Sequence, residues 1–146
     1  MTPKLPVSVL VVVQAAGDVL LLERAARPGY WQSVTGSLDR ADEPPAAAAL
    51  RELREETGIA ARAEQLRRWN LAYTFEIYAQ WRHRFAPGTT HNTEHVFSIE
   101  LPRRMPVVLA PDEHVASEWL AWPEAAARCF SWSNRDAIRI VASCAH

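Results

Sequence analysis

The stretch that decides the fold is residues 36–59, which read GSLDRADEPPAAAALRELREETGI. Residues 46–57 are rich in Ala, Leu, Glu and Arg, all strong helix formers. Asp42 and Glu43 precede them, where acidic side chains suit the positive end of a helix dipole and can cap it, and prolines are tolerated in a first turn. Gly58 supplies a C-terminal stop. The stretch therefore predicts a helix entered from a glycine-containing loop.

The predicted helix carries an acidic stripe beside an apolar one. At 100° per residue, Glu52, Glu55 and Glu56 fall within a sector of roughly 100°. Such like charges, close to the negative end of the helix dipole, destabilise an isolated helix unless cations offset them. Arg51 can pair with Glu55, and a hard divalent cation, Mg²⁺ or Mn²⁺, would satisfy the other carboxylates. An ordinary solvated helix face explains the spacing equally well.

Strands are expected on both sides of this helix. Residues 7–13 form an almost unbroken, mostly β-branched apolar run, which is typical of a strand buried on both faces. Further strands are expected at 19–23, 31–38, 66–73, 75–85, 95–101 and 118–122. A helix should begin at Pro123, and Ser131 or Ser133 should cap a last helix that ends near residue 142. The pattern predicts an α/β fold in a single domain, residues 1–146.

Composition narrows the function classes. Lys plus Arg is 16 and Asp plus Glu is 17, a net charge of −1, which argues against a protein that coats nucleic acids or membranes. No stretch approaches the roughly 20 apolar residues of a membrane helix. The only cysteines, Cys129 and Cys144, have no zinc-site spacing and suit a reducing compartment, so we expect a cytoplasmic location.

Residues 36–59 resemble the signature of the Nudix hydrolases, Gx5Ex7REUxEExGU, where U is aliphatic. Arg51-Glu52-Leu53 and the run 55–59 match it in order and spacing. One extra residue separates Gly36 from Glu43, so Asp42 stands where the first acid is expected. This insertion leaves open whether Asp42 or Glu43 takes that acid's role.

The resemblance implies a Nudix-type α/β/α sandwich around a mixed β-sheet and a metal-dependent pyrophosphohydrolase. Glu52 and Glu56 would then be metal ligands, with Mg²⁺ as the expected ion and Mn²⁺ as an alternative. Glu55 would be a further ligand or a proton acceptor, and Arg51 would orient the carboxylates. These four residues are the expected catalytic set.

Segments outside the motif indicate which group of Nudix enzymes the chain resembles. Residues 31–37, 82–88, 92–94 and 131–135 are similar to bacterial Nudix enzymes of folate biosynthesis that hydrolyse dihydroneopterin triphosphate and also act on dATP. This similarity implies a third metal ligand at Glu113. It also implies substrate contacts at Lys4, Arg24, Thr35 and Ser131. The expected partner is a small pterin or nucleoside triphosphate, with no membrane and no stable nucleic-acid partner, and the chain could be a monomer or a homodimer.

Several alternatives remain at this point. A Nudix enzyme of another specificity, such as one that removes damaged dNTPs or RNA 5′-pyrophosphate, would carry the same helix. A binding module without catalysis is disfavoured because Arg51, Glu52, Glu55 and Glu56 are all present. Arg82 and Arg84 would share one face of the expected 75–85 strand, which is either exposed or turned toward the phosphates. Trp31 or Trp132 could stack on a flat heterocycle or simply pack against the protein.

Overall fold

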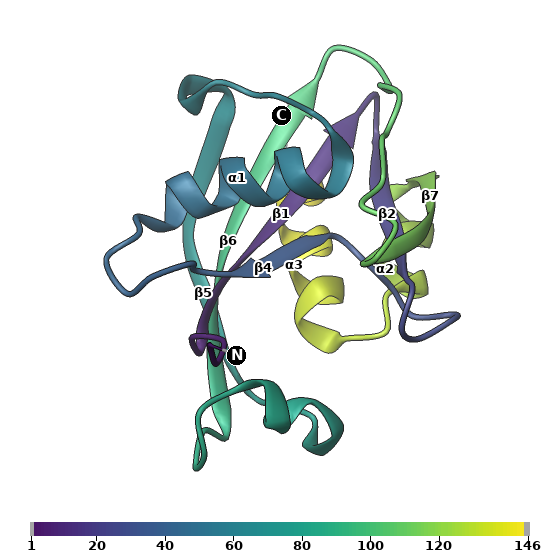
Figure 1. Cartoon of the computed structure of the whole chain (residues 1–146). Coiled ribbons are helices and arrows are strands. Elements are labelled where there is room, and N and C mark those ends of the chain that lie inside the picture. Colours follow the sequence, from purple (N-terminus) through teal and green to yellow (C-terminus); the bar gives the residue numbers. More distant parts are fainter. Residues whose placement is uncertain (1, 145–146) are drawn as a thin grey trace.

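A mixed seven-stranded sheet forms the centre of the molecule (Figure 1), in a computed structural model that describes residues 2–144. The main path runs β3 (Trp31–Gln32), β2 (Asp18–Arg24), β1 (Val7–Ala15), β6 (His91–Leu101) and β5 (Leu66–Glu76). Strand β4 (Val34–Ser37) pairs with β1, and β7 (His114–Ala121) pairs with β2. The β1–β6 pair is parallel and the other pairs are antiparallel.

Helices cover both faces of the sheet, as Figure 1 shows: α1 (Pro45–Thr57) lies across one face, and α2 (Trp122–Arg128) and α3 (Trp132–Ser143) lie against the other. Strand β1 contributes side chains to the core on both faces of the sheet, because successive side chains point to opposite faces. Val9 packs in the cluster that contains Leu53 of α1, and Leu10 packs in the cluster that contains Ile138 of α3. The predicted α/β/α sandwich around a mixed sheet is confirmed.

The C-terminal end of α1 lies where the sequence predicts it, but the N-terminal cap differs from the prediction. Gly58 closes the helix with φ 75°, and its N–H donates to the carbonyl of Arg54. The expected acidic cap is wrong: Pro44 is the N-cap, no side chain caps the helix, and the first turn holds no acid. Proline lacks an N–H, so a helix that begins at Pro45 has one donor fewer to satisfy. The Glu43 carboxylate is engaged elsewhere.

The segment after β5 also differs from the prediction. The expected strand 75–85 is wrong, because β5 ends at Glu76 and the chain turns into a 3₁₀ helix, η2 (Ala79–Arg84). The rings of Tyr78 and Trp81 meet edge to face, with centroids 5.3 Å apart, and Trp81 packs against Phe130 at 5.9 Å. This aromatic contact folds the segment back toward the start of α3. A second short 3₁₀ helix, η1 (Ala63–Gln65), precedes β5.

No helix within residues 2–144 is both long and apolar enough to cross a membrane.

Candidate active site

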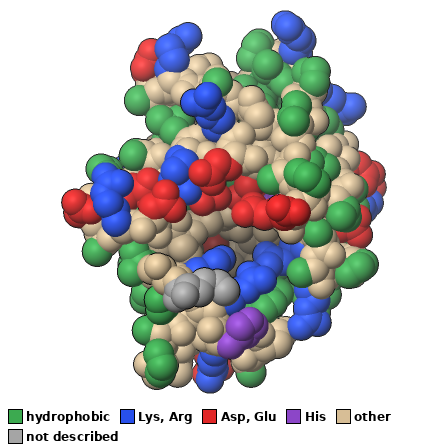
Figure 2. Space-filling model, viewed as in Figure 1, with side chains coloured by type: hydrophobic (Ala, Val, Ile, Leu, Met, Phe, Trp, Pro, Cys, Tyr) green, Lys and Arg blue, Asp and Glu red, His purple; other side chains and the backbone are tan. Residues whose placement is uncertain are grey.

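A cleft of about 650 Å³ opens beside β4 and the acidic side of α1. Its walls also include the N-terminal segment, η2, the loop before β7 and the first turn of α3. Figure 2 shows a row of acidic side chains crossing this face along α1, with lysine and arginine side chains below it around a hollow. The cleft therefore has an acidic wall opposite a basic one.

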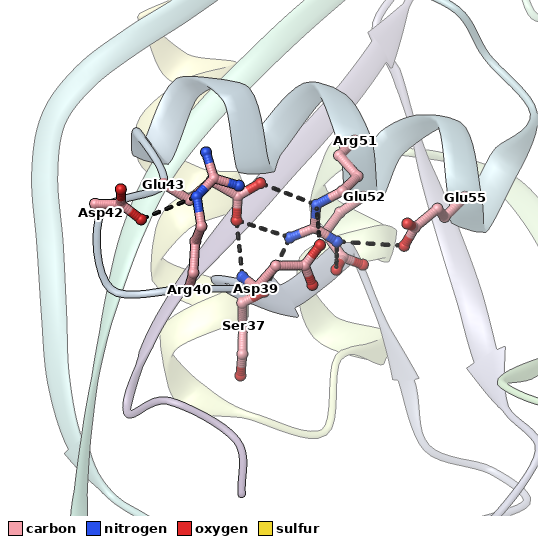
Figure 3. Close-up of polar contacts among 8 residues, drawn as sticks. All are labelled: Ser37, Asp39, Arg40, Asp42, Glu43, Arg51, Glu52 and Glu55. Atoms are coloured by element: carbon pink, nitrogen blue, oxygen red, sulfur yellow. Dashed lines mark hydrogen bonds and ion pairs between the residues drawn. The ribbon is translucent and has the colours of Figure 1, made fainter. Parts of the chain in front are cut away.

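Arg51 organises the acidic wall (Figure 3). Its Nε and Nη2 donate to the two oxygens of Glu43 at 3.0 and 3.1 Å, and its Nη1 donates to Glu52 Oε1 at 2.7 Å. The same Nη1 lies 3.4 Å from Glu55 Oε2. Hydrogen bonds to Glu43 raise the pKa of Arg51 further above its already high value. One guanidinium thus fixes the orientation of three carboxylates.

Of Asp42 and Glu43, it is Glu43 that pairs with Arg51. Glu43 is buried, accepts both Arg51 bonds and also accepts the backbone N–H of Asp39 at 2.8 Å. Hydrogen bonds from Arg51 hold its pKa below the usual value. Asp42 is exposed and pairs with Arg40 at the surface (Figure 3). The extra residue in the motif is absorbed in the loop, so the helix register is unaffected.

Gly36 is required by the position of Glu52. A Cβ at Gly36 would overlap the Glu52 carboxyl group, because β4 passes directly beneath it. The backbone of Gly36 lies outside the left-handed region, so this glycine serves close packing and not a turn. The strand and the Arg51 bond together leave the Glu52 carboxylate little freedom.

Glu56 is the most deeply buried carboxylate of the site. Its side chain is 1% exposed, and within the described residues neither carboxylate oxygen has a hydrogen-bond partner. Burial, together with the neighbouring Glu52 and Glu113, raises its pKa well above the usual value, and burial also raises the pKa of Glu52. A buried carboxylate without a donor is strongly disfavoured unless a cation or a proton accompanies it.

The surroundings of Glu56 fit a divalent cation. Ligand atoms of Glu56, Glu113 and His114 all lie within 4.8 Å of one another, and Glu52 stands one helical turn before Glu56. Glu113 is exposed, but its carbonyl accepts the N–H of Ala25, which ties its loop to the end of β2. Carboxylate oxygens are the ligands that hard divalent cations prefer.

His114 faces this cluster as a positioning group. Gln32 Nε2 lies 3.3 Å from His114 Nε2, so the neutral ring accepts there and carries its proton on Nδ1. Nδ1 is 3.8 Å from Glu56 Oε1. Burial and the nearby Arg24 lower the pKa of His114 to about 4, which keeps the ring neutral near pH 7. His114 thus directs an N–H toward Glu56.

The basic wall contains Lys4, Arg24 and Arg84, all of which line the cleft. Lys4 N donates to the carbonyl of Arg84 at 2.8 Å, which brings the N-terminal segment against η2. Desolvation by the cleft walls and the charges of Arg84 and Arg24 lower the pKa of Lys4; desolvation and Arg84 lower that of Arg24. Cations that depress one another's pKa values form a ready site for a polyanion.

The other residues predicted to contact substrate also line the cleft. Thr35 lies on β4, and its hydroxyl accepts from Gln32 Nε2 at 3.3 Å. Ser131 caps α3 by accepting from Asn134 N, as predicted. Trp132 is 47% exposed and lines the cleft, whereas Trp31 packs against the α3-side cluster.

Sequence reasoning missed His114 and Glu94 as cleft residues, and it left open whether Arg84 is exposed or turned toward the phosphates. Arg82 and Arg84 do not share a face: Arg82 Nε donates to the Ile77 carbonyl, while Arg84 lines the cleft. The five histidines show no metal-ligand spacing, so nothing singled out His114. The predicted strand begins only at residue 95, so nothing in the sequence marks Glu94 as a buried strand residue.

Comparison with known proteins finds a matching family model and similar curated proteins. The family model described as a NUDIX domain matches residues 3–139. A dihydroneopterin triphosphate diphosphatase of Escherichia coli (strain K12) is 48% identical over 139 residues, 92% of this chain and 91% of the relative. One from Haemophilus influenzae is 37% identical over 136 residues, 90% of this chain and 84% of the relative.

Solved structures agree with this similarity. The structure of the E. coli dihydroneopterin triphosphate pyrophosphohydrolase has a TM-score of 0.91 and 44% identity, covering 98% of this chain and 99% of that one. A NUDIX hydrolase from Listeria monocytogenes, at 20% identity and a TM-score of 0.76, shares the fold.

Proposed function

The chain belongs to the Nudix hydrolase family, and we propose that it hydrolyses dihydroneopterin triphosphate to dihydroneopterin monophosphate and diphosphate in a Mg²⁺-dependent reaction. The similarity to dihydroneopterin triphosphate diphosphatases, over nine-tenths of the chain, supports this substrate. A weaker activity toward dATP belongs to the same proposal. The substrate is a small molecule. The cytoplasmic location expected from the cysteine pattern stays a prediction.

The observation that carries the proposal is the pair of oppositely charged walls in one cleft. Carboxylates of α1 and Glu113 form one wall, and Lys4, Arg24 and Arg84 form the other. A triphosphate chain between them would meet cations on one side and carboxylate-bound metal on the other. Neither wall alone would hold a polyanion next to buried acids.

Nudix hydrolases generally depend on a divalent metal, and this chain has the residues to hold one. We assign Glu52, Glu56 and Glu113 as its ligands, with Mg²⁺ as the physiological ion and Mn²⁺ as a substitute. When bound, such an ion neutralises phosphate oxygens and acidifies a water molecule. Arg51 orients Glu52, and His114 directs its N–H toward Glu56.

Side chains around the metal ligands supply the rest of the chemistry. Glu55 lies at the cleft rim, exposed and held by Arg51, where it can accept the proton of the attacking water. Lys4, Arg24 and Arg84 bind the phosphates, and Thr35 and Ser131 offer hydroxyl groups. A cysteine nucleophile is disfavoured because burial raises the pKa of Cys129 to about 12.

A substrate panel tests the proposal. Purified protein is incubated with Mg²⁺ and either dihydroneopterin triphosphate, dATP or dGTP, and the products are separated into diphosphate and orthophosphate. We expect the highest kcat/KM for the pterin compound, with diphosphate as the only inorganic product. A clear preference for a nucleotide, or release of orthophosphate, would contradict the assignment and favour a Nudix enzyme of another specificity.

A further inference from the structure

Glu94 is a buried acid in the cleft that the proposed chemistry does not use. It lies on β6, paired with Ser8 of β1 on one side and Tyr73 of β5 on the other. Its side chain is 5% exposed and lines the cleft on the sheet face that packs against α3. It therefore lies on the sheet face opposite α1, the helix that carries Glu52 and Glu56.

The charge of Glu94 is uncompensated. In the described part of the chain, its Oε1 has no hydrogen-bond partner and no cation forms an ion pair with it. Burial raises its pKa to about 7, and a hydrogen bond from Ser133 only partly opposes this. A buried carboxylate with an unpartnered oxygen destabilises the folded protein. Its presence in a cleft therefore points to a ligand that supplies hydrogen-bond donors.

A second unpartnered acceptor lies beside it. Asn92 is two residues earlier on β6 and so projects from the same face. Its Nδ2 donates to the Ser8 hydroxyl at 2.8 Å, and its buried Oδ1 has no partner among residues 2–144. This part of the cleft wall therefore offers hydrogen-bond acceptors and calls for a ligand edge made of donors.

Aromatic side chains near these acceptors suit a flat ring. Phe75 pairs with Asn92 across the β5–β6 ladder, and Trp132 stands at the start of α3; both line the cleft. Phe130 and Trp81 add further rings to the same cleft. Flat heterocycles bind well against such surfaces, with their polar edges satisfied in the plane of the ring.

The spacing to the phosphate end is also suitable. Ser8 pairs with Glu94 on one side and with Ser37 on the other, so the Cα atoms of Glu94 and Ser37 are two strand spacings apart, on the order of 10 Å. Ser37 follows Gly36, which packs against the Glu52 carboxylate. A bicyclic ring with a short polyol chain can bridge this interval.

We propose that Glu94 is the specificity-determining residue of the cleft and accepts two hydrogen bonds from the 2-amino and ring N–H groups of a 2-amino-4-oxopyrimidine edge. This inference rests on the proposed function, because dihydropterins carry that edge. Guanine carries it too. Adenine instead presents one donor and one acceptor side by side, so a carboxylate leaves its ring nitrogen unpaired.

Glu94→Gln tests the pairing directly, since an amide offers one acceptor and one donor. We compare kcat/KM for dihydroneopterin triphosphate, dGTP and dATP with Mg²⁺. The variant should lose about ten- to one-hundredfold with the pterin compound and dGTP, the value of one bidentate contact, while dATP changes by less than about threefold or improves. An equal loss with all three substrates, or unchanged ratios, would overturn the proposal.

Two further variants make the result decisive. Glu100→Gln, on the same strand at an exposed position, should behave as wild type. Glu94→Asp keeps two acceptor oxygens and should keep the preference for the pterin compound over dATP. Loss of that preference would contradict the proposal even if Glu94→Gln fails to fold. If wild type does not hydrolyse dihydroneopterin triphosphate at all, the proposed function fails, and the dGTP-to-dATP ratio alone decides the role of Glu94.

Discussion

Gly36→Ala should disable the site without unfolding the protein. The added methyl group would overlap the end of the Glu52 side chain, whereas the backbone of Gly36 is open to any residue. Since carbon atoms approach only to about 3.5 Å, the carboxylate must retreat by about 1 Å or more. Misplacement of a reacting group by 1 Å can lower the rate by about one-hundredfold. We expect kcat to fall by that factor and Mg²⁺ affinity to fall with it.

The assay measures kcat with dihydroneopterin triphosphate, Mn²⁺ affinity by calorimetry, and thermal unfolding. The melting temperature in EDTA should stay close to that of wild type, because the atoms nearest the added methyl group all belong to the end of one side chain and none to the backbone. Glu52→Asp provides the control: its shorter side chain relieves the overlap, so Gly36→Ala should add little further loss in that background. Wild-type metal affinity in Gly36→Ala, or fully additive losses in the double variant, would show that β4 does not hold the Glu52 carboxylate in place.

Three further variants separate the roles of the buried acids. Glu56→Gln should lower Mg²⁺-dependent kcat at least about one-hundredfold. It should also raise the melting temperature in EDTA, because it removes a buried carboxylate that has no hydrogen-bond donor. A normal rate would exclude Glu56 as a metal ligand. Glu43→Gln should lower the free energy of unfolding in urea by about 1–3 kcal/mol, because it weakens the hydrogen bonds from Arg51. Asp42→Asn, at an exposed ion pair, should change that free energy by less than about 0.5 kcal/mol. Equal effects of the two substitutions would contradict the role given to Glu43. The pKa of Glu94 is about 7 when folded, above its ordinary value of 4.5, so its ionisation destabilises the folded state fully above pH 7 and progressively less as pH falls toward 4.5. Glu94→Gln should therefore gain up to about 3 kcal/mol more over wild type at alkaline than at acidic pH, and a pH-independent difference between the two unfolding curves would contradict this.

The helix and the inner strands were predictable because their signals are local. Apart from Ser8, residues 7–13 are apolar on both sides of the strand, and β1 is accordingly buried on both faces. The glycine stop at Gly58 depends only on its neighbours in the chain. The start of α1 was not predicted correctly, because Glu43 bonds to Arg51, eight residues away, instead of capping the helix.

The predicted 75–85 strand was wrong for a tertiary reason. Its alternating residues suit a strand, but the contact of Trp81 with Phe130 turns the chain into η2. The same turn carries Arg84 into the cleft beside Lys4. No local pattern encodes an aromatic contact between segments nearly fifty residues apart in sequence.

The candidate site was partly predictable for similar reasons. Helical spacing alone places Glu52 and Glu56 on one side of α1. The approach of Glu113 and His114 to Glu56 depends on the β2–β7 pairing, which no spacing rule reveals. Glu94 becomes informative only once its burial and its unpartnered Oε1 are known.

We infer that carboxylates of α1, joined by Glu113, bind the metal that holds the phosphate chain. Anomalous diffraction from crystals soaked with Mn²⁺ and a non-hydrolysable triphosphate tests it most directly. We predict a manganese peak in contact with carboxylate oxygens of Glu52, Glu56 and Glu113 and with phosphate oxygens. Manganese bound elsewhere, with the Glu56 carboxylate still unliganded, would contradict the account.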